Sequence, residues 1–186
     1  IRSETPWEGI IESADAGIAE FCPANGDVEV SGAEAHIYAC VISQLPPLPE
    51  PDPDFPANLG GVQGWSFSMP LSGDLNLLSA TTAGTAADTV GNGGYYDGGF
   101  NKTQVVDPDK EGNDGQQGAV SAIVLSFTNG NTLPPVGTES VLDMVVEPTS
   151  APEVDAPVTG EILFRDGLVG AGQPVINAIT VGGDTR

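Results

Sequence analysis

One stretch of alternating residues, 62–69, constrains the fold of this chain more than any other feature. Large apolar side chains alternate there with serines, in the order Trp65, Ser66, Phe67, Ser68 and Met69. Successive side chains of an extended chain point to opposite faces of a sheet. The alternation is therefore typical of a strand that has one face in a core and the other face in water.

Other segments also have the composition of strands. Residues 119–127 are apolar at nearly every position, as in a strand that is covered on both faces. Residues 35–42 carry apolar or weakly polar side chains on both faces, Tyr38 and Cys40 included, and we expect the same double cover for them. The chain contains 25 Gly and 16 Pro residues, and no region has a sustained helical period. We therefore predict an all-β fold.

These segments carry a resemblance to a known family. The order VQGWSFSM, a long polar insert, AIVLSFTN, TLPP and VLDMVVE resembles the cohesin-type β-sandwich domains of bacterial extracellular proteins. The closing stretch ILFRDGLVGAGQPVINAITVGG resembles the last strands of such domains, so the resemblance covers residues 27–183. It implies an antiparallel β-sandwich of cohesin-like, jelly-roll type, in a secreted module that holds other proteins or copies of itself and is not an enzyme.

We expect the chain to have two parts, an N-terminal extension at residues 1–24 and a cohesin-like β-sandwich domain at 25–186. A length of 186 residues suits one all-β domain. The longest apolar run, around 122–125, is too short to span a bilayer. The first residues lack the basic and apolar regions of a signal peptide, so we expect a processed terminus of a secreted or cell-surface protein.

The charge of the chain is strongly acidic. Twenty-six acidic residues and five basic residues give a formal net charge of -21. Such a field repels nucleic acid and anionic membrane surfaces. The expected partners are cations, neutral sugars or proteins.

Cys22 and Cys40 are the two cysteines of the chain. Neither belongs to a CxxC pair, and a single histidine accompanies them, which argues against a metal site or a thiol nucleophile. In an extracellular setting we predict a disulfide between them, and the chain-entropy model gives it about 3 kcal/mol of stabilisation. The alternative is two buried free thiols.

The leader before Cys22 contains a small apolar cluster, Trp7, Ile10 and Ile11, inside an acidic run. Two interpretations compete for it, and both end in a strand near residues 17–21. The leader either forms a first strand on its own sandwich, or it is an exchangeable strand that completes the sheet of a neighbouring copy by β-strand addition.

The insert at 81–118 is rich in Gly, Asn and Asp and contains three aromatic residues among glycines, Tyr95, Tyr96 and Phe100. On an exposed loop they would stack on sugar rings or dock on a neighbour. The alternative is that they cover the end of the sandwich core. Asn101-Lys-Thr103 is an N-glycosylation sequon.

An acidic turn at 107–115 is the candidate metal site. Its candidate ligands for Ca²⁺ are Asp107, Asp109, Glu111 and Asp114. Calcium takes several hard oxygen ligands from a flexible loop, and Gly112 falls where an EF-hand loop has its sharp turn. Position twelve is Gly118 instead of a bidentate Glu, so the segment is not an EF-hand. It is either a looser calcium loop on a β scaffold or a solvated acidic turn.

No catalytic pattern stands out in the chain. His36 lies in a predicted strand with no nucleophile motif beside it, which favours a structural role. We therefore predict a non-enzymatic subunit of an extracellular fibre, filament or adhesive matrix that assembles from copies of itself, with donor-strand exchange as the connection. The alternatives are a binding module for a dockerin-type protein and a carbohydrate-binding module.

Overall fold

A computed structural model of the chain describes residues 18–22, 27–45, 61–88, 94–128, 130–150, 157–181 and 184–185. The trace consists of strands joined by turns and loops. The strands are β1 (Ile18–Cys22), β2 (Asp27–Val30), β3 (Ala35–Gln44), β4 (Val62–Gly73), β5 (Leu75–Thr81), β6 (Phe100–Val105), β7 (Gln117–Val124), β8 (Val136–Pro148), β9 (Val158–Ile162), β10 (Ala178–Val181) and β11 (Asp184–Thr185). No helix in these described ranges is long and apolar enough to cross a membrane.

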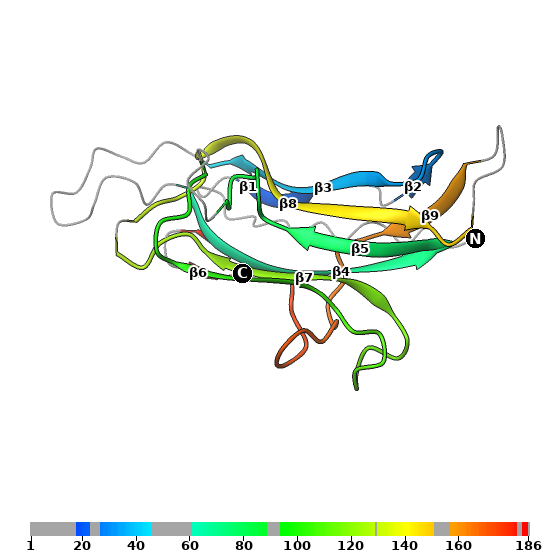
Figure 1. The fold of residues 1–186 in the computed structure, drawn as a ribbon. Coiled ribbons are helices and arrows are strands. Elements are labelled where there is room, and N and C mark those ends of the chain that lie inside the picture. Colours follow the sequence, from blue (N-terminus) through cyan, green and yellow to red (C-terminus); the bar gives the residue numbers. More distant parts are fainter. Residues whose placement is uncertain are drawn as a thin grey trace, which may run out of the picture.

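The strands form two antiparallel sheets that pack face to face (Figure 1). The four-stranded sheet has the order β1-β3-β8-β5. The seven-stranded sheet has the order β11-β10-β4-β7-β6, and β9 pairs with both β4 and β2. Two such layers with their apolar faces together form a β-sandwich. The predicted all-β antiparallel sandwich is confirmed.

The core lies between the two sheets, and the inward side of β4 supplies its largest side chains. Trp65, Phe67 and Met69 are all buried, as their alternation predicts. The ring of Phe67 meets Phe21 of β1 and Phe164, which follows β9, at centroid separations of 5.3 Å each. These three rings join β1, at the edge of one sheet, to the middle of the other sheet.

The serine face of β4 does not face water, contrary to the sequence prediction. Ser68 is fully buried and Ser66 is half-buried. β10 and β9 pair with the two halves of one edge of β4. The segment between them folds over the serine face, where its carbonyls accept from the hydroxyls of Ser66 and Ser68. The backbone N–H of Ser68 donates to Asn177 Oδ1 at 2.8 Å, and its hydroxyl donates to the carbonyl of Arg165. Alternation shows that a side is polar, but it does not show what covers it.

The prediction for β3 was also wrong on one face. Ala39 and Val41 are buried in the core, but Tyr38 on the opposite face is 52% exposed. No further layer of described chain lies on the outer side of the four-stranded sheet. Apolar composition therefore overstated the cover of this strand.

Double cover is confirmed for β7 only over part of the predicted 119–127 segment. On the outer face of the seven-stranded sheet, Val120 packs with Val106 and Leu168 in a second small core. Phe127, beyond the end of the strand, is 69% exposed. The outer face of β7 is therefore buried only where the loops that carry Val106 and Leu168 cross it.

The predicted closing strand at 178–181 is confirmed as β10. The other, predicted at 161–165, is displaced towards the N-terminus and is observed as β9, Val158–Ile162. The residues after β9 leave the strand and begin the crossing over Ser68.

Candidate functional site

The two cysteines form the predicted disulfide. Cys22 and Cys40 lie directly opposite each other in the antiparallel register of β1 and β3, with their Cα atoms 4.9 Å apart. That separation lies in the usual range for a disulfide. The bond fastens an edge strand of five residues to β3, which pairs over ten residues with β8.

The leader residues Trp7, Ile10 and Ile11 lie outside the described residues, so their role in assembly stays a prediction. The structure does describe the segment that the leader enters. β1 is an edge strand whose Ala19 is fully buried and whose Phe21 packs on the core. The last five residues before Pro23 therefore belong to the four-stranded sheet.

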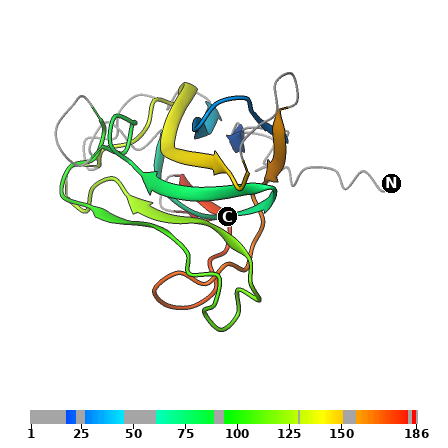
Figure 2. The same cartoon turned by 45° about the vertical axis from the view of Figure 1, so that its right-hand side comes forward.

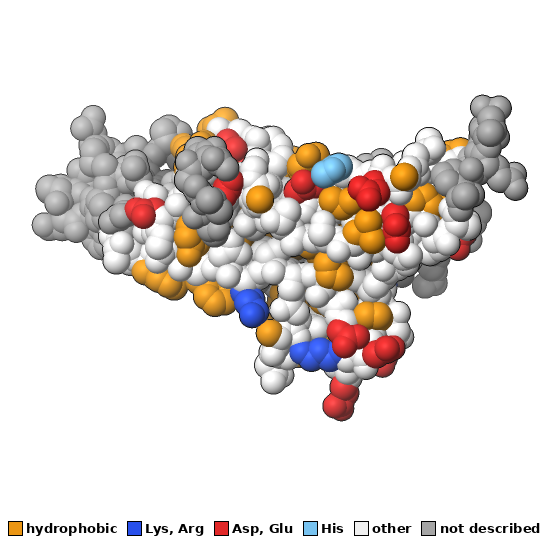
Figure 3. Space-filling view, viewed as in Figure 1, with side chains coloured by type: hydrophobic (Ala, Val, Ile, Leu, Met, Phe, Trp, Pro, Cys, Tyr) orange, Lys and Arg blue, Asp and Glu red, His pale blue; other side chains and the backbone are white. Residues whose placement is uncertain are grey.

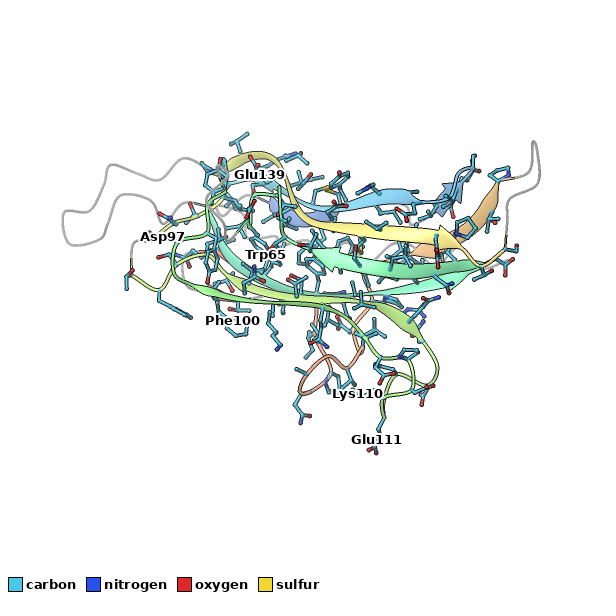
Figure 4. All side chains as sticks on the ribbon, viewed as in Figure 1. Trp65, Asp97, Phe100, Lys110, Glu111 and Glu139 are labelled. Atoms are coloured by element: carbon cyan, nitrogen blue, oxygen red, sulfur yellow. A yellow bond between two sulfur atoms is a disulfide. The ribbon has the colours of Figure 1, made fainter. Side chains whose placement is uncertain are left out.

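The three aromatic residues of the insert do not form one exposed cluster. Tyr95 and Tyr96 are half-buried against the main core, and the Tyr96 hydroxyl donates to the carbonyl of Gly99 at 3.0 Å. Phe100 is 46% exposed on β6 (Figure 4). The two tyrosines thus cover the core, as the alternative interpretation expected, and only Phe100 is presented to solvent.

The sequon residue Asn101 is half-buried and engaged through both atoms of its amide. Its Nδ2 donates to Thr82 Oγ1 at 2.9 Å, and its Oδ1 accepts from the hydroxyl of Thr103 at 3.1 Å. A glycan on Nδ2 would displace the bond to Thr82. Glycosylation at Asn101 stays a prediction.

The candidate calcium ligands lie in a tight turn. Asp107 Oδ1 accepts from the backbone N–H of Asp109 at 3.0 Å, so this carboxylate caps its own loop. Asp109, Glu111 and Asp114 are exposed, and Gly112 has a φ of 94°, as a sharp turn requires. No group of three or more His, Cys, Asp or Glu side chains in the described part of the chain is placed to share a metal ion. Calcium binding stays a prediction.

Sequence reasoning missed Asn113, which fastens this turn to the segment 165–177. Asn113 is 2% exposed. Its Nδ2 donates to the carbonyls of Asp107 at 2.8 Å and Val169 at 3.1 Å, and its Oδ1 accepts from the N–H of Val169 at 2.7 Å. Lys110 Nζ donates to the carbonyl of Gly170. The two loops project together from the seven-stranded sheet, as Figure 2 also shows. An asparagine among Asp and Gly gives no sequence signal for this role.

Gln117 is a second residue that the sequence did not reveal. It begins β7, but its side chain reaches across to β5, the edge strand of the other sheet. Gln117 Nε2 donates to the carbonyl of Leu75 at 2.6 Å, and its Oε1 accepts from the N–H of Leu77 at 3.0 Å. The side-chain amide thus occupies backbone groups that a further strand would otherwise use.

His36 lies on β3, at the outer face of the four-stranded sheet. His36 Nδ1 lies 3.0 Å from Asp143 Oδ1 of the neighbouring strand β8, and the imidazole stacks near Tyr38 at a centroid separation of 6.3 Å. The side chain of His36 is 55% exposed. The contact is a surface pair across two strands.

β6 is the terminal strand of the seven-stranded sheet and has no strand partner on its outer side among the described residues. Exposed apolar residues lie at one end of it: Phe100 is 46% exposed and Phe127, past the end of β7, is 69% exposed. Figure 3 shows hydrophobic side chains gathered along this lower border of the molecule. An unpaired edge beside apolar side chains is a candidate interaction site.

Comparison of the chain with protein-family models, curated proteins and solved structures found no match. The cohesin resemblance therefore stays a prediction, and the site must be interpreted from its own geometry.

Proposed function

We propose that this chain is a non-catalytic extracellular structural subunit that assembles into a filament or adhesive matrix by lending its leader to a neighbouring copy. The leader supplies a short apolar segment, Trp7, Ile10 and Ile11, of the kind that β-strand addition uses. Head-to-tail contacts of this type do not close, so they extend into filaments.

One observation carries the proposal, namely the way in which the segment after the leader is fastened. A leader held by a neighbour would pull on β1, an edge strand of only five residues. The Cys22–Cys40 disulfide transfers such a pull to β3, in the interior of the sheet. A covalent link at this position suits a subunit whose N-terminus is under load. It also suits an extracellular location, since disulfides persist in oxidising surroundings.

The test compares the full chain with a variant that carries Trp7→Ser, Ile10→Ser and Ile11→Ser. We expect the full chain to form regular filaments in negative-stain electron microscopy, and the variant to remain dispersed with an unchanged melting temperature. Ser3→Ala and Ser13→Ala form the matched control, which should assemble normally. Filaments from the triple variant, or no filaments from the full chain at physiological salt, would refute the proposal.

Protein binding is the second candidate function, and the outer face of the four-stranded sheet favours it. Tyr38 is 52% exposed there and Leu78 is 45% exposed, beside the pair of His36 and Asp143. A partner on this face would lose affinity with Tyr38→Ala and would be indifferent to the triple leader variant. Titration of a captured partner with both variants separates the two functions.

A further inference from the structure

Two edge strands, β5 and β6, lie on the same side of the sandwich, one in each sheet. They differ in whether the backbone groups along the outer edge have hydrogen-bond partners. The edge of β5 is occupied at Leu75 and Leu77 by the Gln117 amide. At the next turn, Thr82 is bridged to Asn101 of β6. The outer edge of β6 receives no strand from the described chain. A strand that arrives on this side of the molecule therefore meets a β6 edge that no described strand pairs with, and a β5 edge that the Gln117 amide occupies.

The side chains of β6 favour an acidic, apolar strand. Phe100 and Lys102 are two residues apart, so they lie on the same face of β6, and both are exposed. Lys102 is one of only five basic residues in a chain of net charge -21. A lysine on an edge strand discourages pairing with a second copy of the same strand, but it attracts a strand that carries carboxylates.

The leader has the matching pattern. Glu8, Ile10 and Glu12 fall at every second position, so they share one face when the segment is extended. If Ile10 lies beside Phe100, the neighbouring position on that face brings a glutamate beside Lys102 in either strand direction. The residue is Glu8 in an antiparallel pair and Glu12 in a parallel pair. The apolar contact with Phe100 and the charge pair with Lys102 can therefore form together, whether the leader pairs parallel or antiparallel to β6.

We propose that β6 is the edge that accepts the leader of a second copy, with Ile10 against Phe100 and a leader glutamate against Lys102. The inference rests on the proposed function, and it specifies which surface of the subunit receives the donated strand. The seven-stranded sheet would gain an eighth strand from the neighbour. Successive subunits would then be joined from β1 of one copy to β6 of the next.

The test is disulfide trapping between two full-length variants, one with Ile10→Cys and the other with Phe100→Cys. Leu78→Cys serves as the matched acceptor control, because Leu78 on β5 is 45% exposed and Phe100 is 46% exposed. We expect mild oxidation of the mixed assemblies to give several-fold more cross-linked dimer with Phe100→Cys than with Leu78→Cys. Mass spectrometry of the peptides would assign the bond.

A charge swap provides a second, independent readout. Lys102→Glu should slow filament growth several-fold, and Glu8→Lys with Glu12→Lys in the same chain should restore it. Glu8→Lys with Glu12→Lys in a chain that keeps Lys102 is the control. It makes the net charge less negative, so a general effect of net charge would speed growth, whereas direct pairing with Lys102 predicts slower growth.

The outcomes separate the two proposals. Filaments that form without the cross-link at residue 100, or that give equal cross-linking at residues 78 and 100, overturn the assignment to β6 and leave leader donation intact. Filaments that survive the triple leader variant overturn leader donation, and the assignment to β6 falls with it. Preferential cross-linking at residue 100 together with the charge rescue supports both.

Discussion

The outer faces of the two sheets are held by different means. On the four-stranded sheet no further layer of the described chain covers the outer face, and the contacts there include a disulfide and the pair of His36 and Asp143. On the seven-stranded sheet two long loops cross the face, and they are joined by the buried side chain of Asn113. The segments on one outer face are thus held by a covalent bond, and those on the other face by buried hydrogen bonds.

The difference shows how burial determines the energy that a polar contact contributes to stability. A pair that remains in water exchanges one set of hydrogen bonds for another, whereas a buried group that loses its partner retains the cost of desolvation. We therefore expect similar contacts on the two faces to differ severalfold in energy. Four variants, three on the two faces and one at the edge between the sheets, are taken in order of decreasing effect.

Removal of the disulfide should have the largest effect. With Cys22→Ala and Cys40→Ala together, we expect the free energy of unfolding in urea to fall by about 3 kcal/mol, because the unfolded chain regains the entropy of an open loop. The wild-type chain under reducing conditions is the control and should show a similar loss. A loss below about 1 kcal/mol would indicate that packing of Phe21 holds β1 without the bond.

Asn113→Ala should cost about 2 kcal/mol, because two carbonyls and one N–H lose their buried partner. We expect the loss to be local, so the projecting loops should open and expose Lys110 to trypsin. Limited proteolysis followed by mass spectrometry measures this opening. Asp109→Ala, on an exposed neighbour in the same turn, is the control and should leave cleavage unchanged. Equal protection of both variants would mean that the small apolar core alone holds the loops together.

Gln117→Leu should cost about 1 to 2 kcal/mol, since Leu75 and Leu77 lose the amide that occupies their backbone groups. The variant also opens the edge of β5, so we expect association that does not require the leader. Light scattering of the triple leader variant, with and without Gln117→Leu, measures it. Gln117→Glu keeps the acceptor and loses the donor, so its effect should be intermediate. A strictly monomeric Gln117→Leu protein would contradict the role of Gln117 as an edge cap.

Asp143→Asn should have the smallest effect, about 0.5 kcal/mol or less, because His36 is largely exposed and water replaces the contact. The melting temperatures of Asp143→Asn and of His36→Gln, each compared with that of the wild-type chain, measure this effect. A loss above about 1 kcal/mol would erase the contrast between the two faces.

Much of the local structure follows from the sequence alone. The alternation in β4 identifies Trp65, Phe67 and Met69 as core residues, because side-chain direction in a strand is a property of the backbone itself. Two cysteines without metal-binding company indicate a disulfide, and Gly112 marks a turn because it adopts a positive φ without strain. The first and the last of these inferences depend only on neighbours in the chain, and the disulfide depends on the cysteine and histidine content of the whole sequence.

The tertiary structure decided what each polar face meets. Ser68 is buried by a segment almost 100 positions away, Asn113 bonds to Val169, and Gln117 finishes the edge of a strand in the other sheet. Likewise, Tyr95 and Tyr96 turn to the core while Phe100 remains on an edge. Periodicity records the direction of a side chain relative to its own strand. It contains no information about which distant strand or loop arrives there, and that arrival determines both the energy of the contact and the edge left open to a partner.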